Sequence, residues 1–259
     1  MPLLHMNFHS HALGMACSCD ILLPDTVQYP NAQERKNYPV LYLLHGLSDD
    51  HTIWQRRTRI ESYVTGKDLI VVMPNVHRSF YTNTVSGHKY FDFVAEELPA
   101  ICKAYFPVSD KREDTFVAGL SMGGYGALKL ALTYPDRYAA VASLSGVTLI
   151  TDRLIREVTP ERSNEFLHVF GPVEEVAGSG NDLTALADRI IAEKIQKPAV
   201  FMACGESDFL LQDNRIFRER YGEAFNINYM EAPGNHNWDF WDTHIQKVLA
   251  WLPLPCNQE

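Results

Sequence analysis

One serine of this chain lies in a sequence pattern that is typical of an activated nucleophile. A short apolar run begins at residue 115 and breaks at Gly119, and Gly119 and Gly123 flank Ser121 in the order glycine-x-serine-x-glycine. We expect a strand before the serine and a helix over residues 127–132. Such a turn projects the serine hydroxyl above the sheet, and small flanking residues let strand and helix approach closely. The pattern therefore predicts a catalytic serine at position 121.

A serine hydroxyl is a weak nucleophile, so this hypothesis requires a histidine base and a carboxylate that orients it. In the α/β-hydrolase arrangement the chain order is serine, acid, histidine. Only His236 and His244 lie beyond the next two expected strands. His236 lies in a loop of turn residues between the last strand and the last helix, whereas His244 falls inside that helix. We predict that His236 is the base and that His244 has no catalytic role.

Three carboxylates compete for the role of the acid. A triad carboxylate is expected just past the carboxyl end of a sheet strand, and the expected strand 199–203 is followed by Glu206, Asp208 and Asp213. Asp208 is far enough beyond the strand to turn back towards the histidine. Asp213 starts the next helix, where the helix dipole favours a negatively charged side chain. We therefore prefer Asp208 over Glu206 and Asp213.

The reaction also needs two backbone N–H groups that face the developing oxyanion. One is expected from Met122, the residue after the nucleophile. The other is expected from the loop that follows the first buried strand, where His45 and Gly46 precede Leu47. We predict the Leu47 amide as the second donor. An ordinary strand-ending turn at His45 and Gly46 is the alternative.

The elements that position these residues alternate between strand and helix. Apolar runs predict strands over 39–44, 69–73, 115–118, 138–144, 199–203 and 227–231, and helical spacing is found over 53–64, 90–105 and 214–225 and near the carboxyl terminus. Alternation of this kind indicates a mostly parallel sheet with helices on both faces. Two antiparallel edge strands are expected before Pro24. We predict a single α/β domain over residues 1–259.

The segment of residues 147–196 breaks this alternation. It contains Pro160, Gly171 and Pro172 and the glycine-serine-glycine triplet 178–180. So many residues that interrupt helices and strands are not expected within one long element. An insertion at this place would cover the active site as a cap. A surface loop with its own small core is an equally weighted alternative.

Composition excludes several classes of function. A formal charge of −9 without long blocks of like charge argues against a nucleic-acid or membrane surface, and no apolar stretch is long enough for a transmembrane helix. The amino terminus lacks the features of a signal peptide, so a cytoplasmic location is expected. The odd number of scattered cysteines, five, indicates reduced thiols that are mostly buried. No metal-binding spacing is found, and we expect neither metal nor cofactor.

Several motifs occur together in the order found in one family. They are 40–50, Trp54, 81–84, 96–99, 118–126, 204–210 and 234–236. In these motifs the chain resembles the bacterial tributyrin esterases of the esterase D group, whose relatives include S-formylglutathione hydrolases and feruloyl or acetylxylan esterases. The resemblance covers about residues 6–254. It implies an α/β-hydrolase fold, carboxylesterase activity on short-chain acyl esters and a triad of Ser121, Asp208 and His236, with the Leu47 and Met122 amides as oxyanion donors.

The chain departs from formylglutathione hydrolases in the shorter connection between Tyr81 and residues 96–99. It also has Asn235 where they tend to carry an aspartate before the histidine. The segment 147–196 is the least similar to the family. Feruloyl, acetylxylan and S-formylglutathione esters therefore stay open as substrates, and acyl transfer to an alcohol or thiol stays open as the reaction.

Aromatic residues near the motifs predict a small acyl pocket that is closed at one end. We expect Trp54, Tyr81, Phe209 and Trp238 to contact substrate, and Phe80, Phe166 and Phe170 to add to the wall. The expected partner is a small ester. The sequence is compatible with a homo-oligomer but does not require one.

Overall fold

The computed structural model of the protein describes residues 1–25, 37–156 and 160–254. Its strands are β1 (Leu3–Ser10), β2 (Met15–Leu22), β3 (Val40–Leu44), β4 (Ile70–Pro74), β5 (Thr115–Leu120), β6 (Ala140–Leu144), β7 (Ala199–Gly205) and β8 (Asn228–Ala232). Its α-helices are α1 (Ile53–Arg57), α2 (Ile60–Val64), α3 (Tyr90–Asp92), α4 (Leu98–Tyr105), α5 (Met122–Thr133), α6 (Ile150–Arg156), α7 (Pro160–Phe170), α8 (Val173–Val176), α9 (Leu183–Ala192), α10 (Leu211–Phe225) and α11 (Trp238–Trp251).

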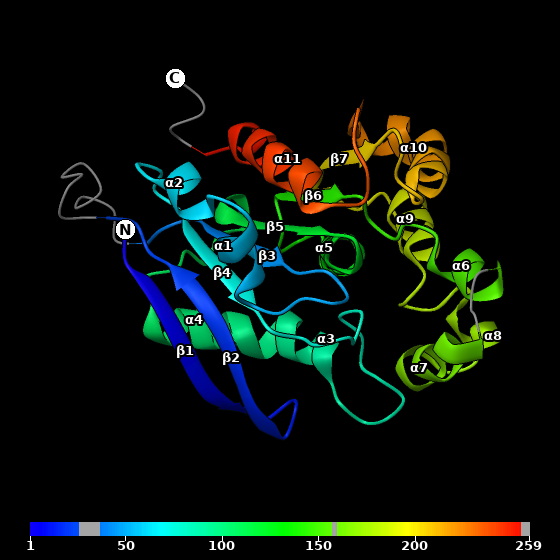
Figure 1. Cartoon of the computed structure of the whole chain (residues 1–259), viewed down its shortest axis with the longest axis horizontal. Helices are drawn as coiled ribbons and strands as arrows, with labels where there is room; N and C mark the ends of the chain where they lie inside the picture. The colour runs from blue at the N-terminus through cyan, green and yellow to red at the C-terminus, as the bar shows by residue number, and fades with distance from the viewer. Residues whose placement is uncertain (26–36, 157–159, 255–259) are drawn as a thin grey trace.

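The strands form one twisted sheet in the order β1-β2-β4-β3-β5-β6-β7-β8 (Figure 1). Strands β1 and β2 pair antiparallel with each other, and β2 pairs antiparallel with β4, whereas all other neighbours are parallel. The expected antiparallel edge and parallel centre are thus confirmed. Strand β5, which leads to Ser121, lies in the middle of the sheet between β3 and β6.

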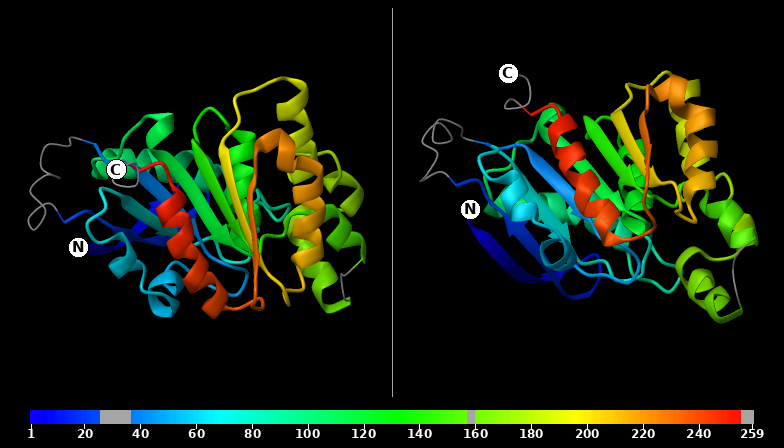
Figure 2. Two further views of the ribbon diagram at one scale, coloured as in Figure 1. Left: turned by 90° about the horizontal axis from the view of Figure 1, so that it is seen from above. Right: turned by 45° about the horizontal axis from the view of Figure 1, so that its top comes forward.

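Helices cover both faces of the sheet (Figure 2). On β3 the side chains alternate between two apolar clusters: Tyr42 and Leu44 pack on the side of α4, α5, α9 and α10, whereas Leu41 and Leu43 pack on the side of α1, α2 and α11. All five residues of β3 are buried. A strand that is buried on both faces needs apolar residues at every position, which explains its unbroken apolar sequence.

Element boundaries differ from the sequence predictions in three places. The single helix expected over 53–64 is two short helices, because Thr58 adopts an extended conformation between α1 and α2. The helix expected over 90–105 contains a π-helical turn over Phe93–Glu97 between α3 and α4. The helix expected over 127–132 begins five residues earlier, at Met122, directly after the serine turn. The other expected strands and helices are present within about three residues of their predicted ends.

The segment between β6 and β7 contains the four helices α6 to α9. Helix α9 packs against α5 and belongs to the layer that covers the sheet. Helices α6, α7 and α8 project from one end of the sheet, beyond the carboxyl ends of β5 and β6 (Figures 1 and 2). The part of this insertion that caps the sheet is therefore shorter than the whole segment 147–196.

Cys17, Cys19, Cys102 and Cys204 are buried free thiols, as predicted, and Cys256 lies outside the described residues. Within the described part of the chain, none of the helices has the length and apolar character needed to cross a bilayer.

Candidate active site

Ser121 occupies a strained turn between β5 and α5. Its φ of 52° and ψ of −117° lie outside the regions that most residues adopt. The turn brings strand and helix so close that a Cβ atom on Gly119 would lie 2.3 Å from the Gly123 carbonyl oxygen. A Cβ atom on Gly123 would lie 2.5 Å from the carbonyl oxygen of Leu44 on β3. Both glycines of the motif are thus required by close approach of the backbone.

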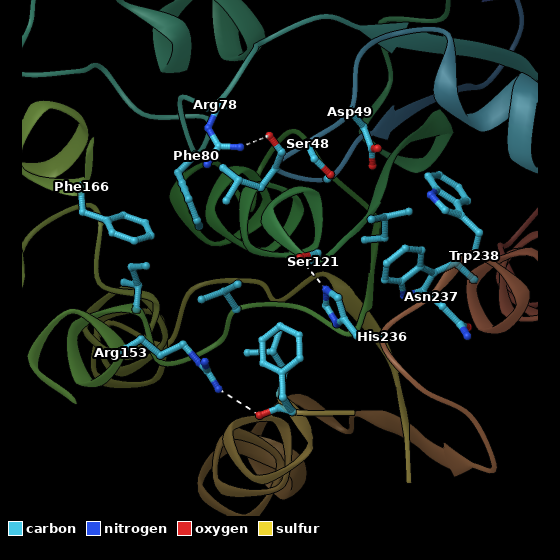
Figure 3. A pocket seen from close by; sticks show the side chains of 18 of the residues that line it. Ser48, Asp49, Arg78, Phe80, Ser121, Arg153, Phe166, His236, Asn237 and Trp238 are labelled. Atoms are coloured by element: carbon cyan, nitrogen blue, oxygen red, sulfur yellow. Dashed lines mark hydrogen bonds between the residues drawn. The ribbon is translucent and has the colours of Figure 1, made fainter. Parts of the chain in front are cut away.

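The three side chains predicted as a triad are hydrogen-bonded to one another. The Ser121 Oγ lies 3.0 Å from His236 Nε2 (Figure 3). His236 Nδ1 lies 2.9 Å and 3.1 Å from the two carboxylate oxygens of Asp208. Because a carboxylate can only accept, Nδ1 carries the proton. The lone pair of Nε2 is then available to the serine hydroxyl. This tautomer is the one that a general base at position 236 requires.

Two backbone hydrogen bonds between the loops after β7 and β8 bring the acid to the histidine. The Glu206 amide donates to the Ala232 carbonyl oxygen, and the Ser207 amide donates to the Gly234 carbonyl oxygen, both at 2.9 Å. Asp208 is the residue after Ser207, and His236 lies two residues after Gly234. Asn237 then caps helix α11, because its side chain accepts from the Phe240 amide.

Asp208 is buried, with 6% of its surface exposed. Burial alone would raise the pKa of its carboxyl group. Hydrogen bonds from His236, from the Leu210 amide and from Ser145 outweigh burial and hold this pKa below its ordinary value. Ser145 was not predicted from the sequence. It follows β6, has a positive φ of 48°, and its Oγ also accepts from the Trp241 indole.

The other residues considered for the triad lie elsewhere. Glu206 is exposed, and Asp213 lies in the first turn of α10, as expected, where it forms an ion pair with Arg153. His244 is buried within α11, and its Nδ1 lies 2.7 Å from the Phe240 carbonyl oxygen. Burial lowers the pKa of His244.

The two residues predicted to supply the oxyanion donors lie next to the serine in the chain or in the same pocket. Met122 is the first residue of α5, and Leu47 lies in the turn after β3 and lines the pocket beside Ser121. In the described part of the chain neither N–H has a hydrogen-bond partner. Both are therefore free to donate to a substrate oxygen.

Ser121 and His236 open into a pocket of about 490 Å³. Phe209 and Trp238 line it, as predicted from the sequence, and so do Phe80 and Phe166. The insertion contributes Val147, Ile150, Arg153, Leu154 and Phe166, so that cap side chains form part of the wall (Figure 3). This volume lies within the range of small-molecule sites, about 300–1,000 Å³.

Trp54 and Tyr81 do not line the pocket, which corrects the prediction for these two residues. Both side chains are fully buried. The Trp54 indole donates to the Leu44 carbonyl oxygen at 3.1 Å and packs edge-on against Trp238. The Tyr81 hydroxyl donates to the His45 carbonyl oxygen at 3.0 Å. Each polar group thus binds backbone near the end of β3, because a buried donor needs an acceptor.

Phe170 lies behind the wall, where its ring packs against Phe80, Phe166 and Tyr125. It is 4% exposed and does not contact the pocket.

Two arginines that were not predicted from the sequence lie at the cap side of the pocket. Arg78 forms a bidentate ion pair with Glu165 of α7 and also donates to the Leu47 carbonyl oxygen at 3.4 Å. Arg153 of α6 pairs with Asp213 at 2.6 Å and donates to the Phe209 carbonyl oxygen (Figure 3). Neither residue lies in a recognisable motif, so only tertiary structure reveals them.

Among residues 1–25, 37–156 and 160–254, no three histidine, cysteine, aspartate or glutamate side chains come together in a way that could hold a metal ion.

The sheet order and the strained serine turn define an α/β-hydrolase. The chain belongs to the "Putative esterase" family, whose model matches residues 10–252. It is similar to an acetyl esterase of Caldicellulosiruptor saccharolyticus, with 33% identity over 97% of this chain and 98% of the relative. The protein is thus a serine hydrolase that acts on carboxylic esters.

Two solved structures from Staphylococcus aureus have the same fold over nearly their whole length. One is the fluorophosphonate-binding serine hydrolase FphF, with a TM-score of 0.88 and 35% identity over 97% of this chain and 98% of that chain. The other is the S-formylglutathione hydrolase FrmB, with a TM-score of 0.85 and 34% identity over 97% of this chain and 99% of that chain. These relatives agree with the resemblance to the esterase D group.

Proposed function

We propose that the protein hydrolyses short-chain acyl esters through the triad of Ser121, His236 and Asp208. The hydrogen-bonded chain from Ser121 Oγ through His236 to Asp208 carries this proposal. In the first step Ser121 Oγ attacks the ester carbonyl carbon while His236 Nε2 takes the hydroxyl proton. The carbonyl oxygen becomes an oxyanion, to which the Leu47 and Met122 amides donate.

The tetrahedral intermediate then collapses. Its bond to the alcohol oxygen breaks, and His236 returns the proton to the leaving alcohol, which leaves an acyl group on Ser121. A water molecule attacks this acyl-enzyme with the same proton transfers and releases the acid. Asp208 stays ionised throughout and holds the imidazole in the required tautomer.

The experiment for the triad is replacement of its nucleophile. Ser121→Ala should fold as the parent does and lose several orders of magnitude in turnover of p-nitrophenyl acetate, because the three triad residues act as one unit. A Ser121→Ala variant with unchanged circular dichroism and near-parental turnover would contradict the proposal.

Preference for short acyl chains rests on the aromatic wall of the pocket and on the similarity to an acetyl esterase. Each methylene that the pocket can bury should add roughly 0.8 kcal/mol of binding, and the first that does not fit should be rejected. We expect the specificity constant to peak between acetyl and about hexanoyl esters. A value that still rises at dodecanoyl would contradict a closed pocket.

The natural ester can be approached with a panel that includes S-formylglutathione and methyl ferulate. S-formylglutathione belongs in it because FrmB is named as a hydrolase of that thioester. Product analysis with and without added alcohol would separate hydrolysis from acyl transfer, because only transfer yields a new ester. We also propose a cytoplasmic enzyme, and the four unpaired buried thiols support this location.

A further inference from the structure

His45 is a buried histidine that the proposed chemistry does not use. It is the residue directly after β3 and is 1% exposed. Its Nε2 accepts a hydrogen bond from the Val76 amide at 3.1 Å. An imidazole nitrogen that accepts from an N–H carries no proton, so the proton of the neutral ring is on Nδ1. Nδ1 therefore donates to the Gly46 carbonyl oxygen, 2.7 Å away.

Burial keeps this ring neutral. It lowers the pKa of His45 from the ordinary value of 6.5 to about 4, although the hydrogen bond to the Gly46 carbonyl opposes the effect. The Nδ1 donor and the Nε2 acceptor are therefore both present at neutral pH.

The bond from Nδ1 fixes the orientation of the peptide that joins Gly46 to Leu47. The same carbonyl oxygen also accepts from the Asp49 amide at 3.2 Å. A trans peptide is planar, and its C=O and N–H point in opposite directions. The described residues contain no cis peptide bond. With the Gly46 oxygen held by His45 and Asp49, the Leu47 N–H must point the other way.

The preceding peptide is also held at both ends. Its carbonyl oxygen, on His45, accepts from the Tyr81 hydroxyl at 3.0 Å. Its N–H, on Gly46, donates to the Asp49 carboxyl group. Three of the four polar groups of these two consecutive peptides are thus hydrogen-bonded to protein. The fourth, the Leu47 N–H, has no partner, and Leu47 lines the same pocket as Ser121.

We infer that His45 is a positioning residue, which turns the Leu47 amide towards the substrate oxyanion through the Gly46 carbonyl. Tyr81 assists by holding the His45 backbone. The inference rests on the proposed oxyanion role of Leu47. Electrostatic preorganisation of this kind acts in the transition state, so loss of the donor should lower kcat and leave KM nearly unchanged.

Substitution of His45 by asparagine or glutamine can distinguish the roles of its two ring nitrogens. In His45→Asn the side-chain amide can occupy the place of Nδ1 and still donate to the Gly46 oxygen. In His45→Gln it reaches the place of Nε2, where it can satisfy Val76 but leaves the Gly46 oxygen without its side-chain donor. We expect kcat for p-nitrophenyl acetate to fall about 100-fold in His45→Gln, and by less than about tenfold in His45→Asn.

A trifluoromethyl ketone provides a second readout, because its adduct with Ser121 carries an oxyanion. Its inhibition constant should rise in His45→Gln by the factor by which kcat falls, while KM and the melting temperature change similarly in both variants. Equal losses of kcat in the two variants, no loss in either, or the greater loss in His45→Asn would overturn the inference.

Tyr81→Phe removes one hydroxyl without a change of shape. It tests the support of the Gly46–Leu47 turn without altering the His45 imidazole. We expect a three- to tenfold fall in kcat at unchanged KM. An unchanged kcat in Tyr81→Phe would overturn the inference even if neither His45 variant folds. Ser121→Ala separates the two proposals. If Ser121→Ala stays active, the proposed function is wrong. If Ser121→Ala is inactive but His45→Gln keeps the parental kcat, only the proposed role of His45 is wrong.

Discussion

The sheet and the cap build the two sides of the pocket by different means. On the sheet side, backbone geometry holds the reacting groups. Ser121 lies in a strained turn, and Gly119 and Gly123 let the backbone segments around it approach closely. Hydrogen-bonded loops place Asp208 next to His236. On the cap side, contacts between side chains hold the wall, namely the ion pairs of Arg78 with Glu165 and Arg153 with Asp213 and the packing of Phe80, Phe166 and Phe170.

A buried lysine lies where the two sides meet. Lys129 of α5 donates to the Asn181 side chain at 2.6 Å, to Thr82 and to the Tyr81 carbonyl oxygen. Burial lowers its pKa to about 7. The reacting groups are thus fixed by the backbone of the sheet, whereas the pocket wall that contacts the acyl group depends on replaceable side chains.

The largest effect is expected on the sheet side. Asp208→Asn should hold His236 in the wrong tautomer and lower kcat about 10⁴-fold, by analogy with the serine-protease triad. Asp213→Asn is the matched control, because Asp213 pairs with Arg153 and not with the histidine. It should lower kcat by less than about tenfold. Steady-state kinetics with p-nitrophenyl acetate measure both, and a large loss at Asp213 alone would reassign the acid.

The next effect concerns stability, and it tests whether the backbone around the oxyanion turn depends on a neutral His45. The pKa of His45 is about 4 in the folded protein and ordinarily 6.5. Between these values the unfolded chain binds the proton more readily, so stability should fall as the pH falls from 6.5 to 4, by on the order of 3 kcal/mol in total. Urea unfolding at several pH values measures this slope.

His45→Asn removes this titration and should flatten the dependence of the unfolding free energy on pH over the same range. Identical slopes in the parent and in His45→Asn would show that other groups cause the loss of stability.

On the cap side, the expected effect is a change in acyl-chain preference. Phe166→Ala should enlarge the pocket and raise the ratio of the specificity constants for octanoyl and acetyl esters about tenfold, which corresponds to about 1.4 kcal/mol, while acetyl turnover changes little. Leu167→Ala is the control, since Leu167 is 48% exposed and does not line the pocket. An unaltered ratio in Phe166→Ala would place the end of the acyl site elsewhere.

The smallest effect is expected for the ion pair between Arg78 and Glu165. Their side chains are 48% and 26% exposed. A pair in contact with water contributes little, so Glu165→Gln should lower the free energy of unfolding by less than about 1 kcal/mol. Urea denaturation measures this change. A loss above about 2 kcal/mol would mean that the cap is held mainly by this pair.

The sequence predicted the sheet and the hydrogen-bonded Ser121, His236 and Asp208 because each depends on a local signal. An apolar run marks a buried strand, glycines mark a tight turn, and loop residues after a strand lie at the active edge of the sheet.

It did not predict Arg78, Arg153 or Ser145, because their positions depend on which loops meet in space. It also placed Trp54 and Tyr81 in the pocket, since an aromatic residue near a motif looks the same whether it faces substrate or supports the turn from behind. The Trp54 indole and the Tyr81 hydroxyl donate to buried carbonyl oxygens close to β3, and these hydrogen bonds orient both side chains away from the pocket.

Catalysis by Ser121 is tested most directly by chemical identification of the nucleophile. The protein would be treated with a fluorophosphonate at neutral pH, and the adduct would be located by intact mass and by peptide sequencing. We predict a single adduct on Ser121, slow labelling in Asp208→Asn and none in Ser121→Ala. An adduct on another residue, or unchanged labelling of Ser121→Ala, would contradict this prediction.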